Sequence, residues 1–597
     1  MKLVPMKNVI YLLFLLPTLL FGQSVSYNLR MEKPQNHYFQ VEMVLRDFSE
    51  TDLLVKLPVW APGSYLVREF SKNINQVKAV DENNNPLAVE KTAKNAWKIK
   101  KNNARTVTVS YEVYAFELTV RTSFLDLSHG FVSGSGVFMY ADGYKALGGS
   151  VTVFPYKSFA TVTTPLKRSA DDIENAKGKT YLFPNYDVLI DAPFEIGNQT
   201  IFHFEAAGVD HEVAFYGEGN YDISKLKEDM PKVVRAATAV FNGQNPNKNY
   251  TFIVHNVVNG QGGLEHLNST VLSVNRWSYA GSGYIDFLNL VAHEYFHLWN
   301  VKRIRPINLG PFNYDEENYT TLLWVMEGFT SYYDELLLVR AGYMTPAEYV
   351  KKLQSTINYV EGSVGSRVQS VAHSSFDAWI KGYRPNENSA NTGMTYYSRG
   401  AMLGAYLDAL IINQTKGKKC LDHFMQTLYA DYYLKQNRGF TDAEFQQSLE
   451  QFIGMDMDEF FAKYVNGTDT PDFNAVFGKL GVGVTYVGKN QASFGASLSQ
   501  DGGKCSVKSI RSNSSAESGG LSVFDEIIAL NGFRIDQSKL EAALAQYKVG
   551  DTFELLVSRD EKLISLSFKM QAYERPAFAL DQPASKNNLF DYWLRTE

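Results

Sequence analysis

The chain has 597 residues, which is more than one hydrophobic core accommodates, so three or four domains are expected. Hydrophobic residues make up 45% of the chain and charged residues 20%, as is ordinary for a globular protein. The net charge is −6 and no run of basic residues occurs, which argues against a nucleic-acid partner.

The N-terminus has the pattern of a secretory leader. Lys2 and Lys7 precede an apolar run over residues 9–21, which is too short for a comfortable membrane span. We expect a signal peptide over residues 1–22, cleaved after Gly22, with an uncleaved membrane anchor as the alternative. No later segment reaches about 18 apolar residues, so the mature protein is expected to be soluble, without membrane contact, in a bacterial periplasm or secreted.

Only two cysteines occur, Cys420 and Cys505, and they lie far apart in the sequence. Their spacing matches no zinc or redox motif, and two free buried thiols are favoured over a disulfide.

From residue 24 to about 184 the sequence predicts an antiparallel β domain with one buried face. Phe39, Val41 and Met43 alternate with polar residues, as residues 107–113 do later. The stretch PGSYLVREF contains Tyr65, Arg68 and Glu69, which are candidates for the rim of a cleft or for simple strand packing.

The next domain is expected to begin near residue 187. Residues 231–241 predict a helix with Pro231 in its first turn, and residues 249–258 predict a strand. The sequence GQGGLEH follows over residues 260–266, where glycines allow the backbone to pass close to a ligand.

Residues 291–300, VAHEYFHLWN, carry the pattern HExxH at His293, Glu294 and His297. On a helix the two histidines lie one turn apart on one face, where both can bind a single Zn²⁺. Glu294 beside them can take a proton from a metal-bound water. Such a pentapeptide also arises by chance, so its neighbours decide its meaning.

A catalytic zinc needs a third protein ligand and an open position for water. Residues 323–338, LWVMEGFTSYYDELLL, predict a second apolar helix with Glu327 near its start. Glu327 is the candidate third ligand, with a carboxylate at the positive end of a helix dipole as the alternative.

These motifs together resemble the glycyl aminopeptidase family of zinc metallopeptidases. The resemblance rests on HEYFHLWNVKRIRP and LWVMEGFTSYY, and on further stretches at residues 57–70, 185–197, 261–266 and 384–400. It implies a multidomain α+β protein with an N-terminal β domain, a thermolysin-like, mostly α catalytic domain and a C-terminal PDZ domain.

The resemblance also implies roles for two further residues. Glu265 would hold the free α-amino group of a peptide substrate, because an ammonium needs a fixed acceptor. A tyrosine of TYYSRG would donate to the oxyanion of the tetrahedral intermediate, with Tyr397 preferred and Tyr396 as the alternative.

The C-terminal region begins with NGTDTPDF, residues 466–473, which predicts a linker. Residues 524–535, FDEIIALNGFRI, read as strand, Asn-Gly turn and strand, and resemble a PDZ domain. The expected peptide-binding loop, residues 493–498, lacks the usual glycine-rich signature, so a site for a peptide chain end and a structural or gating module both stay open.

Five segments are therefore expected: a signal peptide at 1–22, the β domain at 23–186, the zinc peptidase domain at 187–473, the PDZ-like domain at 474–572 and a tail at 573–597.

The function predicted is a Zn²⁺-dependent aminopeptidase that removes N-terminal residues, Gly or Ala by resemblance, from peptides with a free N-terminus. One alternative is a zinc endopeptidase to which the PDZ domain delivers substrate. Another is a non-catalytic periplasmic peptide-binding protein.

Overall fold

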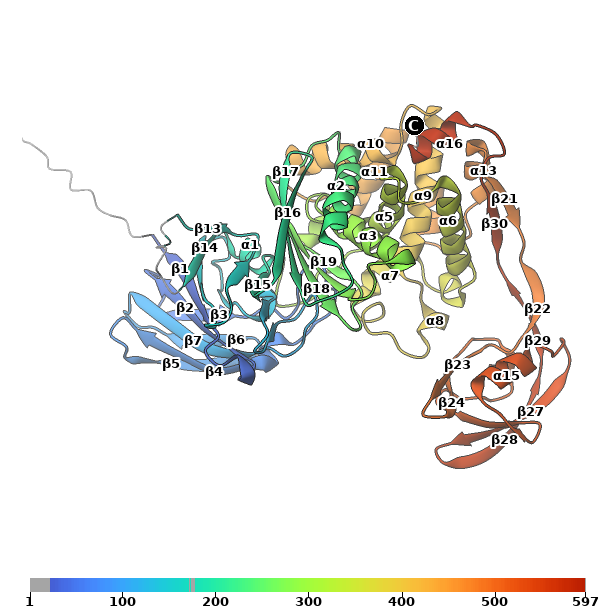
Figure 1. The fold of residues 1–597 in the computed structure, drawn as a ribbon, viewed down its shortest axis with the longest axis horizontal. Helices are drawn as coiled ribbons and strands as arrows, with labels where there is room; N and C mark the ends of the chain where they lie inside the picture. The colour runs from blue at the N-terminus through green and yellow to red at the C-terminus, as the bar shows by residue number, and fades with distance from the viewer. Residues whose placement is uncertain (1–21, 171, 173–177, 596–597) are drawn as a thin grey trace, which may run out of the picture.

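A computed structural model describes residues 22–170, 172 and 178–595; the predicted leader therefore falls almost wholly outside the described residues. Figure 1 shows a β-rich N-terminal domain, a central domain in which helices pack on one side of a sheet, and a small C-terminal domain set apart from both. The expected multidomain α+β architecture is confirmed. Within the described part of the chain, no helix has the length and apolarity that crossing a membrane requires.

The N-terminal domain is built on one large sheet whose inner face is buried and mostly apolar. Phe39, Val41 and Met43 of β2 are buried against Val107 and Val109 of β7, as alternation predicts. The strands follow in the order β10 (Tyr140–Ala141), β3 (Asp52–Lys56), β6 (Ala96–Lys100), β5 (Pro86–Ala93), β4 (Ile74–Asp81), β7 (Thr106–Tyr114), β2 (Tyr38–Arg46), β1 (Ser24–Arg30), β11 (Gly149–Phe154), β14 (Lys179–Phe183) and β13 (Lys167–Arg168).

The expectation of an entirely antiparallel domain was wrong at one pair. β1 lies parallel to β11, because the chain returns to the sheet by a long connection rather than a hairpin.

A second, small sheet joins the N-terminal domain to residues beyond the expected boundary. Its order is β12 (Thr161–Thr163), β15 (Phe194–Gly197), β9 (Gly130–Val132) and β8 (Phe124–Leu125). Leu189 of α1 (Tyr186–Ile190) and Phe194 of β15 are buried in the N-terminal core. This packing favours a boundary near residue 198 over the proposed one at 187.

The central domain contains a mixed sheet that carries the upstream wall of the site. Its order is β16 (Thr200–Ala206), β17 (Val209–Tyr216), β18 (Asn249–Val257), β20 (Ser269–Asn275) and β19 (Gly263–Glu265). β18 runs parallel to both neighbours and is buried almost throughout, and β19 forms the edge of the sheet beside α3 (Gly281–Phe296).

The helix expected at residues 231–241 is longer than predicted. α2 (Ile223–Val240) begins after Asp222, whose carboxylate accepts from the backbone N–H of Ser224 and Lys225, and Pro231 lies inside it. Proline in a helix interior normally ends the helix. Here the N-cap and the buried face, with Met230 and Val234 fully covered, hold the helix together.

Helix α9 of the central domain crosses α4 and α5 at a pair of glycines. α4 (Leu323–Met326) and α5 (Gly328–Arg340) pack on α9 (Tyr396–Thr415), and a Cβ built on Gly400 would lie 2.4 Å from the Trp324 carbonyl oxygen and 2.8 Å from Gly328 Cα. The backbones can approach this closely only because neither residue has a side chain. Further helices surround this crossing: α6 (Pro346–Glu361), α7 (Val371–Phe376), α10 (Leu421–Leu428), α11 (Asp442–Ile453) and α13 (Phe473–Phe477).

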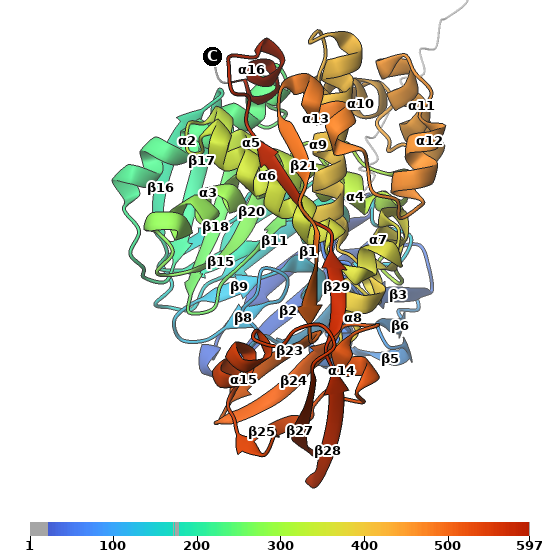
Figure 2. The ribbon, with the colours of Figure 1, turned by 90° about the vertical axis from the view of Figure 1, so that its right-hand side faces the viewer.

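The C-terminal domain hangs from a two-stranded stem that the chain follows out and back (Figures 1 and 2). β21 (Gly483–Tyr486) pairs with β30 (Phe578–Asp581), and β22 (Lys489–Ser493) pairs with β29 (Gln571–Arg575). Between them lie β23 (Ala496–Asp501), β24 (Lys504–Ile510), α14 (Ser515–Ser518), β25 (Glu526–Leu530), β26 (Phe533–Arg534), α15 (Gln537–Leu544), β27 (Thr552–Arg559) and β28 (Lys562–Lys569).

The C-terminal part of the chain has the predicted turn and the predicted free cysteines, but not the predicted linker. Asn531 and Gly532 both have positive φ and join β25 to β26, as the Asn-Gly signal predicts. Cys420 and Cys505 are free and buried, which confirms that prediction. The expected linker is packed instead: Arg399 donates to the Gly467 carbonyl, and Phe473 lies in the central core.

The last residues return to the central domain. α16 (Asn588–Leu594) buries Trp593, whose indole N–H donates to Tyr332 Oη at 2.9 Å on α5. The tail therefore braces one of the helices that form the site.

The glycine crossing yields a stability prediction. Gly400→Ala inserts a methyl group between α9 and α4–α5, and overpacking of this kind typically costs about 1–3 kcal/mol. We expect a loss of that size in the free energy of unfolding of the central domain, measured by urea titration with tryptophan fluorescence. Gln414→Ala, at an exposed position of the same helix, is the control and should change little. Equal stability of the two variants would contradict the proposed backbone contact.

Candidate functional site

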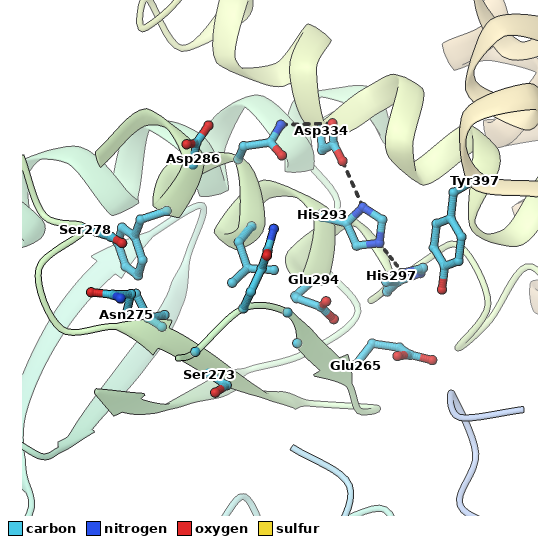
Figure 3. Close-up of a pocket in the computed structure, with 18 of the residues that line it drawn as sticks. Glu265, Ser273, Asn275, Ser278, Asp286, His293, Glu294, His297, Asp334 and Tyr397 are labelled. Carbon is cyan, nitrogen blue, oxygen red and sulfur yellow. Dashed lines mark hydrogen bonds and ion pairs between the residues drawn. The ribbon is translucent and has the colours of Figure 1, made fainter. Parts of the chain in front are cut away.

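The HExxH residues lie at the C-terminal end of α3, facing α5. His293 and Glu294 belong to the last turn of the helix, and His297 is its C-cap residue. His293 Nε2 and His297 Nε2 are 3.2 Å apart, and Glu327 Oε2 lies 3.6 Å from the first and 3.2 Å from the second. The three side chains expected to bind one metal ion are therefore adjacent, and Figure 3 shows the two histidines side by side.

The hydrogen bonds behind each imidazole fix which ring nitrogen faces the cluster as an acceptor. His293 Nδ1 lies 2.9 Å from Asp334 Oδ2, and His297 Nδ1 lies 2.8 Å from the Asn300 carbonyl oxygen. Both partners accept, so in the neutral rings each Nδ1 carries the proton and each Nε2 presents a lone pair.

Three acceptors converging on one point repel one another unless a positive charge lies between them. Burial lowers the pKa of His293, but Asp334 and Glu327 raise it well above its ordinary value. Burial raises the pKa of Glu327, but the two histidines outweigh it and bring the pKa to about 2. The cluster therefore favours an added cation, and two imidazoles with one carboxylate form a donor set suited to zinc.

Glu327 occupies a break between two helices, where α4 ends and α5 begins. The Asn300 side-chain amide holds this break: its N–H groups donate to the carbonyls of Val325 and Met326, each at 2.9 Å. Thr330 adds a hydroxyl bond to the Met326 carbonyl at 2.7 Å. Since Asn300 also accepts from His297, one buried residue ties the HExxH segment to the Glu327 segment.

Glu294 lies between the metal-type cluster and the edge strand β19. It is buried, its Oε2 has no hydrogen-bond donor within the described chain, and a Cβ built on Gly263 would lie 2.4 Å from its carboxyl carbon. Burial raises the pKa of Glu294 to about 7, against the attraction of His293 and His297. A carboxylate with a pKa near neutrality can both accept and return a proton.

A cavity of about 780 Å³ opens in front of these residues. Glu265 on β19 lines it, with a buried side chain whose carboxylate accepts no hydrogen bond from any described residue. Gly63 of the N-terminal domain packs against it: a Cβ there would lie 2.6 Å from Glu265 Oε1. The residues that line the cavity are Gly63, Arg121, Asn259, Gly260, Gln261, Gly262, Gly263, Glu265, Ser273, Val274, Asn275, Ser278, Gly283, Asp286, Phe287, Asn289, Leu290, His293, Glu294, His297, Glu327, Asp334 and Tyr397.

The two candidate tyrosines at the start of α9 have different surroundings. Tyr397 lines the cavity, with its ring centroid 6.3 Å from that of His293. Tyr396 is buried, stacks on Tyr397 and lines no part of this cavity. Figure 3 shows Tyr397 across the hollow from Glu294, with Glu265 below it. The geometry therefore favours Tyr397 over Tyr396 as the candidate oxyanion donor.

Sequence reasoning missed two residues of the site, Asp334 and Asn300. Asp334 Oδ2 holds His293 while its Oδ1 accepts from Asn289 at 2.9 Å, so the carboxylate fixes the histidine to α5. Asp334 lies seven residues after Glu327, two turns along a helix, and that spacing is the signal that could have revealed it.

The three candidates in PGSYLVREF have separate fates. Tyr65 is buried against Trp379, with ring centroids 5.7 Å apart. Glu69 forms an exposed ion pair with Lys94. Arg68 donates to the Ser64 hydroxyl at 3.0 Å and lies near enough to Arg121 for the two charges to act on each other.

The fold and the site together are those of a peptidase with an HExxH-type centre between a β domain and helices. Family models agree along most of the chain: the peptidase M61 N-terminal domain matches residues 26–198, the M61 glycyl aminopeptidase domain residues 286–403 and a PDZ domain residues 478–570. The crystal structure of an aminopeptidase N family protein from Idiomarina loihiensis is 30% identical, covering 96% of this chain and 100% of that chain with a TM-score of 0.88. The chain belongs to the M61 glycyl aminopeptidase family and is a peptidase.

More distant structures also match. An M1 zinc metallopeptidase from Deinococcus radiodurans is 13% identical, covering 75% of this chain and 94% of that chain with a TM-score of 0.48. Leukotriene A4 hydrolase from Saccharomyces cerevisiae is 13% identical, covering 76% and 70% with a TM-score of 0.47. A search of curated protein sequences finds no significant match.

Proposed function

We propose that the protein is a zinc aminopeptidase that removes N-terminal residues, glycine or alanine in particular, from peptides. The observation that carries the proposal is the convergence of two imidazole Nε2 atoms and the Glu327 carboxylate beside two further buried carboxylates, Glu294 and Glu265.

His293, His297 and Glu327 would hold the zinc ion. When bound, zinc supplies a Lewis acid for the scissile carbonyl and lowers the pKa of its water toward about 7. Asp334 and the Asn300 carbonyl hold the two rings in the tautomer that binding requires.

Glu294 acts as the general base. Its buried carboxylate faces the same cavity as the ligands, takes a proton from the attacking water and passes it to the leaving amine. Tyr397 donates its hydroxyl proton as a hydrogen bond to the oxyanion that develops on the scissile carbonyl.

Glu265 determines the direction of the substrate. Its carboxylate faces the cavity, where no described side chain donates to it, so the free α-ammonium of a peptide can form a charge-assisted hydrogen bond with it. A fixed acceptor at this position selects peptides by their N-terminus, so it favours an aminopeptidase over an endopeptidase.

The remaining assignments rest on the sequence. The predicted leader supports export to a periplasm or secretion, and the PDZ domain is proposed as a second contact for peptide chain ends.

The choice of substrate tests the proposal. Zinc-loaded protein should hydrolyse the p-nitroanilides of glycine and alanine faster than that of leucine, and should leave an N-acetylated peptide intact, because acetylation removes the ammonium that Glu265 binds. The measurement is release of p-nitroaniline by absorbance and of peptide fragments by chromatography. Cleavage of the acetylated peptide would indicate an endopeptidase, and no cleavage of either substrate would favour a binding protein.

The two glutamates of the centre should separate metal binding from chemistry. Glu294→Gln should retain bound zinc but lose hydrolysis, because the amide cannot accept the proton. Glu327→Ala should lose both, because it removes a ligand. Zinc content is measured by elemental analysis of dialysed protein and hydrolysis with alanine p-nitroanilide. Sustained turnover by Glu294→Gln would refute its role as the base.

The adjacent tyrosines give a matched pair of variants. Tyr397→Phe should lower kcat by a factor on the order of 10²–10³, the usual cost of removing an oxyanion donor. Tyr396→Phe, one residue away and outside the cavity, should retain most of the activity. Steady-state kinetics on one substrate compare them, and the reverse order would transfer the donor role to Tyr396.

A further inference from the structure

Arg121 is the one lysine or arginine among the described residues that line the catalytic cavity. It lies in the loop between β7 and β8 of the N-terminal domain and reaches across to β19, where its Nη2 donates to the Gly263 carbonyl at 3.3 Å. Its Nε is buried without a hydrogen-bond partner, and no described carboxylate forms an ion pair with it. A guanidinium held in this way has donors left for a ligand.

A second arginine, Arg68, feels the charge of Arg121, which helps to lower the Arg68 pKa beside the larger effect of burial. The Arg68 guanidinium donates only to the Ser64 hydroxyl, with its Nη2 at 3.0 Å, and forms no ion pair with a described residue. The exposed Glu117 is the carboxylate that opposes this lowering of the Arg68 pKa. Neither guanidinium forms a salt bridge with a described carboxylate, so an anion bound near both would offset their mutual repulsion.

The position of Arg121 relative to the edge strand is fixed by packing. Val120, its neighbour, is buried in a small apolar cluster with Leu264 of β19 and Val271 of β20. Side chains alternate along a strand, so Leu264 points into that cluster while Gly263 and Glu265 face the cavity. Arg121 therefore bonds to β19 at Gly263, two residues before Glu265 on the same strand.

This spacing corresponds to the length of a small peptide. Two residues of extended chain span about 7 Å, at 3.3–3.4 Å per residue. A peptide lying along the open edge of β19 with its ammonium at Glu265 would therefore bring a group two residues further on to Gly263 and Arg121. The cavity has a carboxylate at one end of this interval and a guanidinium at the other, which complements a zwitterion.

We propose that Arg121, supported by Arg68, is a subsite for the free C-terminal carboxylate of dipeptides. The inference rests on the proposed aminopeptidase function and adds the substrate class: the protein measures its substrate from both ends and prefers free dipeptides. Longer peptides place a neutral peptide group at the same point and lose the charge-assisted bond, which is worth roughly tenfold to a hundredfold in affinity.

The discriminating measurement is the ratio of kcat/KM for alanyl-alanine to kcat/KM for alanyl-alanine amide. The wild type should show a ratio of roughly 10 to 100, and Arg121→Gln should bring it close to 1. Arg121→Lys keeps the charge and should restore part of the ratio. Arg105→Gln, at a side chain that is 72% exposed and paired with Asp47 in the same domain, is the control and should leave the ratio unchanged.

A binding experiment separates this inference from the proposed function. Calorimetry on the Glu294→Gln protein, with the same two dipeptides, should show tighter binding of the free acid, and the additional Arg121→Gln change should remove that difference. If the protein hydrolyses alanine p-nitroanilide but shows the same kcat/KM and affinity for alanyl-alanine and alanyl-alanine amide, the carboxylate subsite is overturned and the aminopeptidase proposal stands. If the wild type hydrolyses none of the substrates, the proposed aminopeptidase function is refuted. The difference in affinity between the free dipeptide and its amide would still decide whether the carboxylate subsite exists.

Discussion

The structure depends on holding three hydrogen-bond acceptors, two imidazole nitrogens and one carboxylate, within 3.2–3.6 Å of one another in a buried place. Such an arrangement is unfavourable without a cation, so the surrounding fold must oppose its separation. Asp334 and Asn300 do this from behind, because each joins the HExxH segment to α4–α5 by hydrogen bonds. The glycine crossing with α9 and the docked Trp593 brace the same helix on its other sides.

The N-terminal domain completes the cavity rather than merely flanking it. Gly63 packs directly on Glu265, and Arg121 reaches β19 from the opposite domain. The end of the cavity proposed to bind substrate is thus formed by two domains, while the proposed zinc ligands all lie in one. The PDZ domain stands apart on its stem (Figure 1), and its contacts with the central domain include the Asn391 amide, which donates to the Ile510 carbonyl at 2.7 Å. The separation leaves the catalytic cavity to the other two domains.

Local patterns predicted elements well where one residue type has one dominant use. Alternating Phe39, Val41 and Met43 gave a half-buried strand, and Asn531-Gly532 gave a tight turn. Predictions failed where tertiary packing outweighed local preference. Pro231 lies inside α2 because the N-cap at Asp222 and a buried face sustain the helix, and β1 and β11 became parallel neighbours through a long connection that no local signal records. The segment at 466–473 looks like a linker but is held by Arg399.

The sequence by itself determined the chemical groups and their spacing. His293 and His297 lie one helical turn apart with Glu294 between them, and Glu327 follows near the start of the next predicted apolar helix. Those spacings are local, and a helix converts them directly into geometry. Only the tertiary structure decided which groups meet across long separations. It brought Asp334 to His293 and placed Tyr397 rather than Tyr396 on the cavity. It also joined Arg121 to Gly263, two residues before Glu265 on β19. Such contacts depend on how helices, and in the case of Arg121 whole domains, pack against one another, which no local pattern encodes.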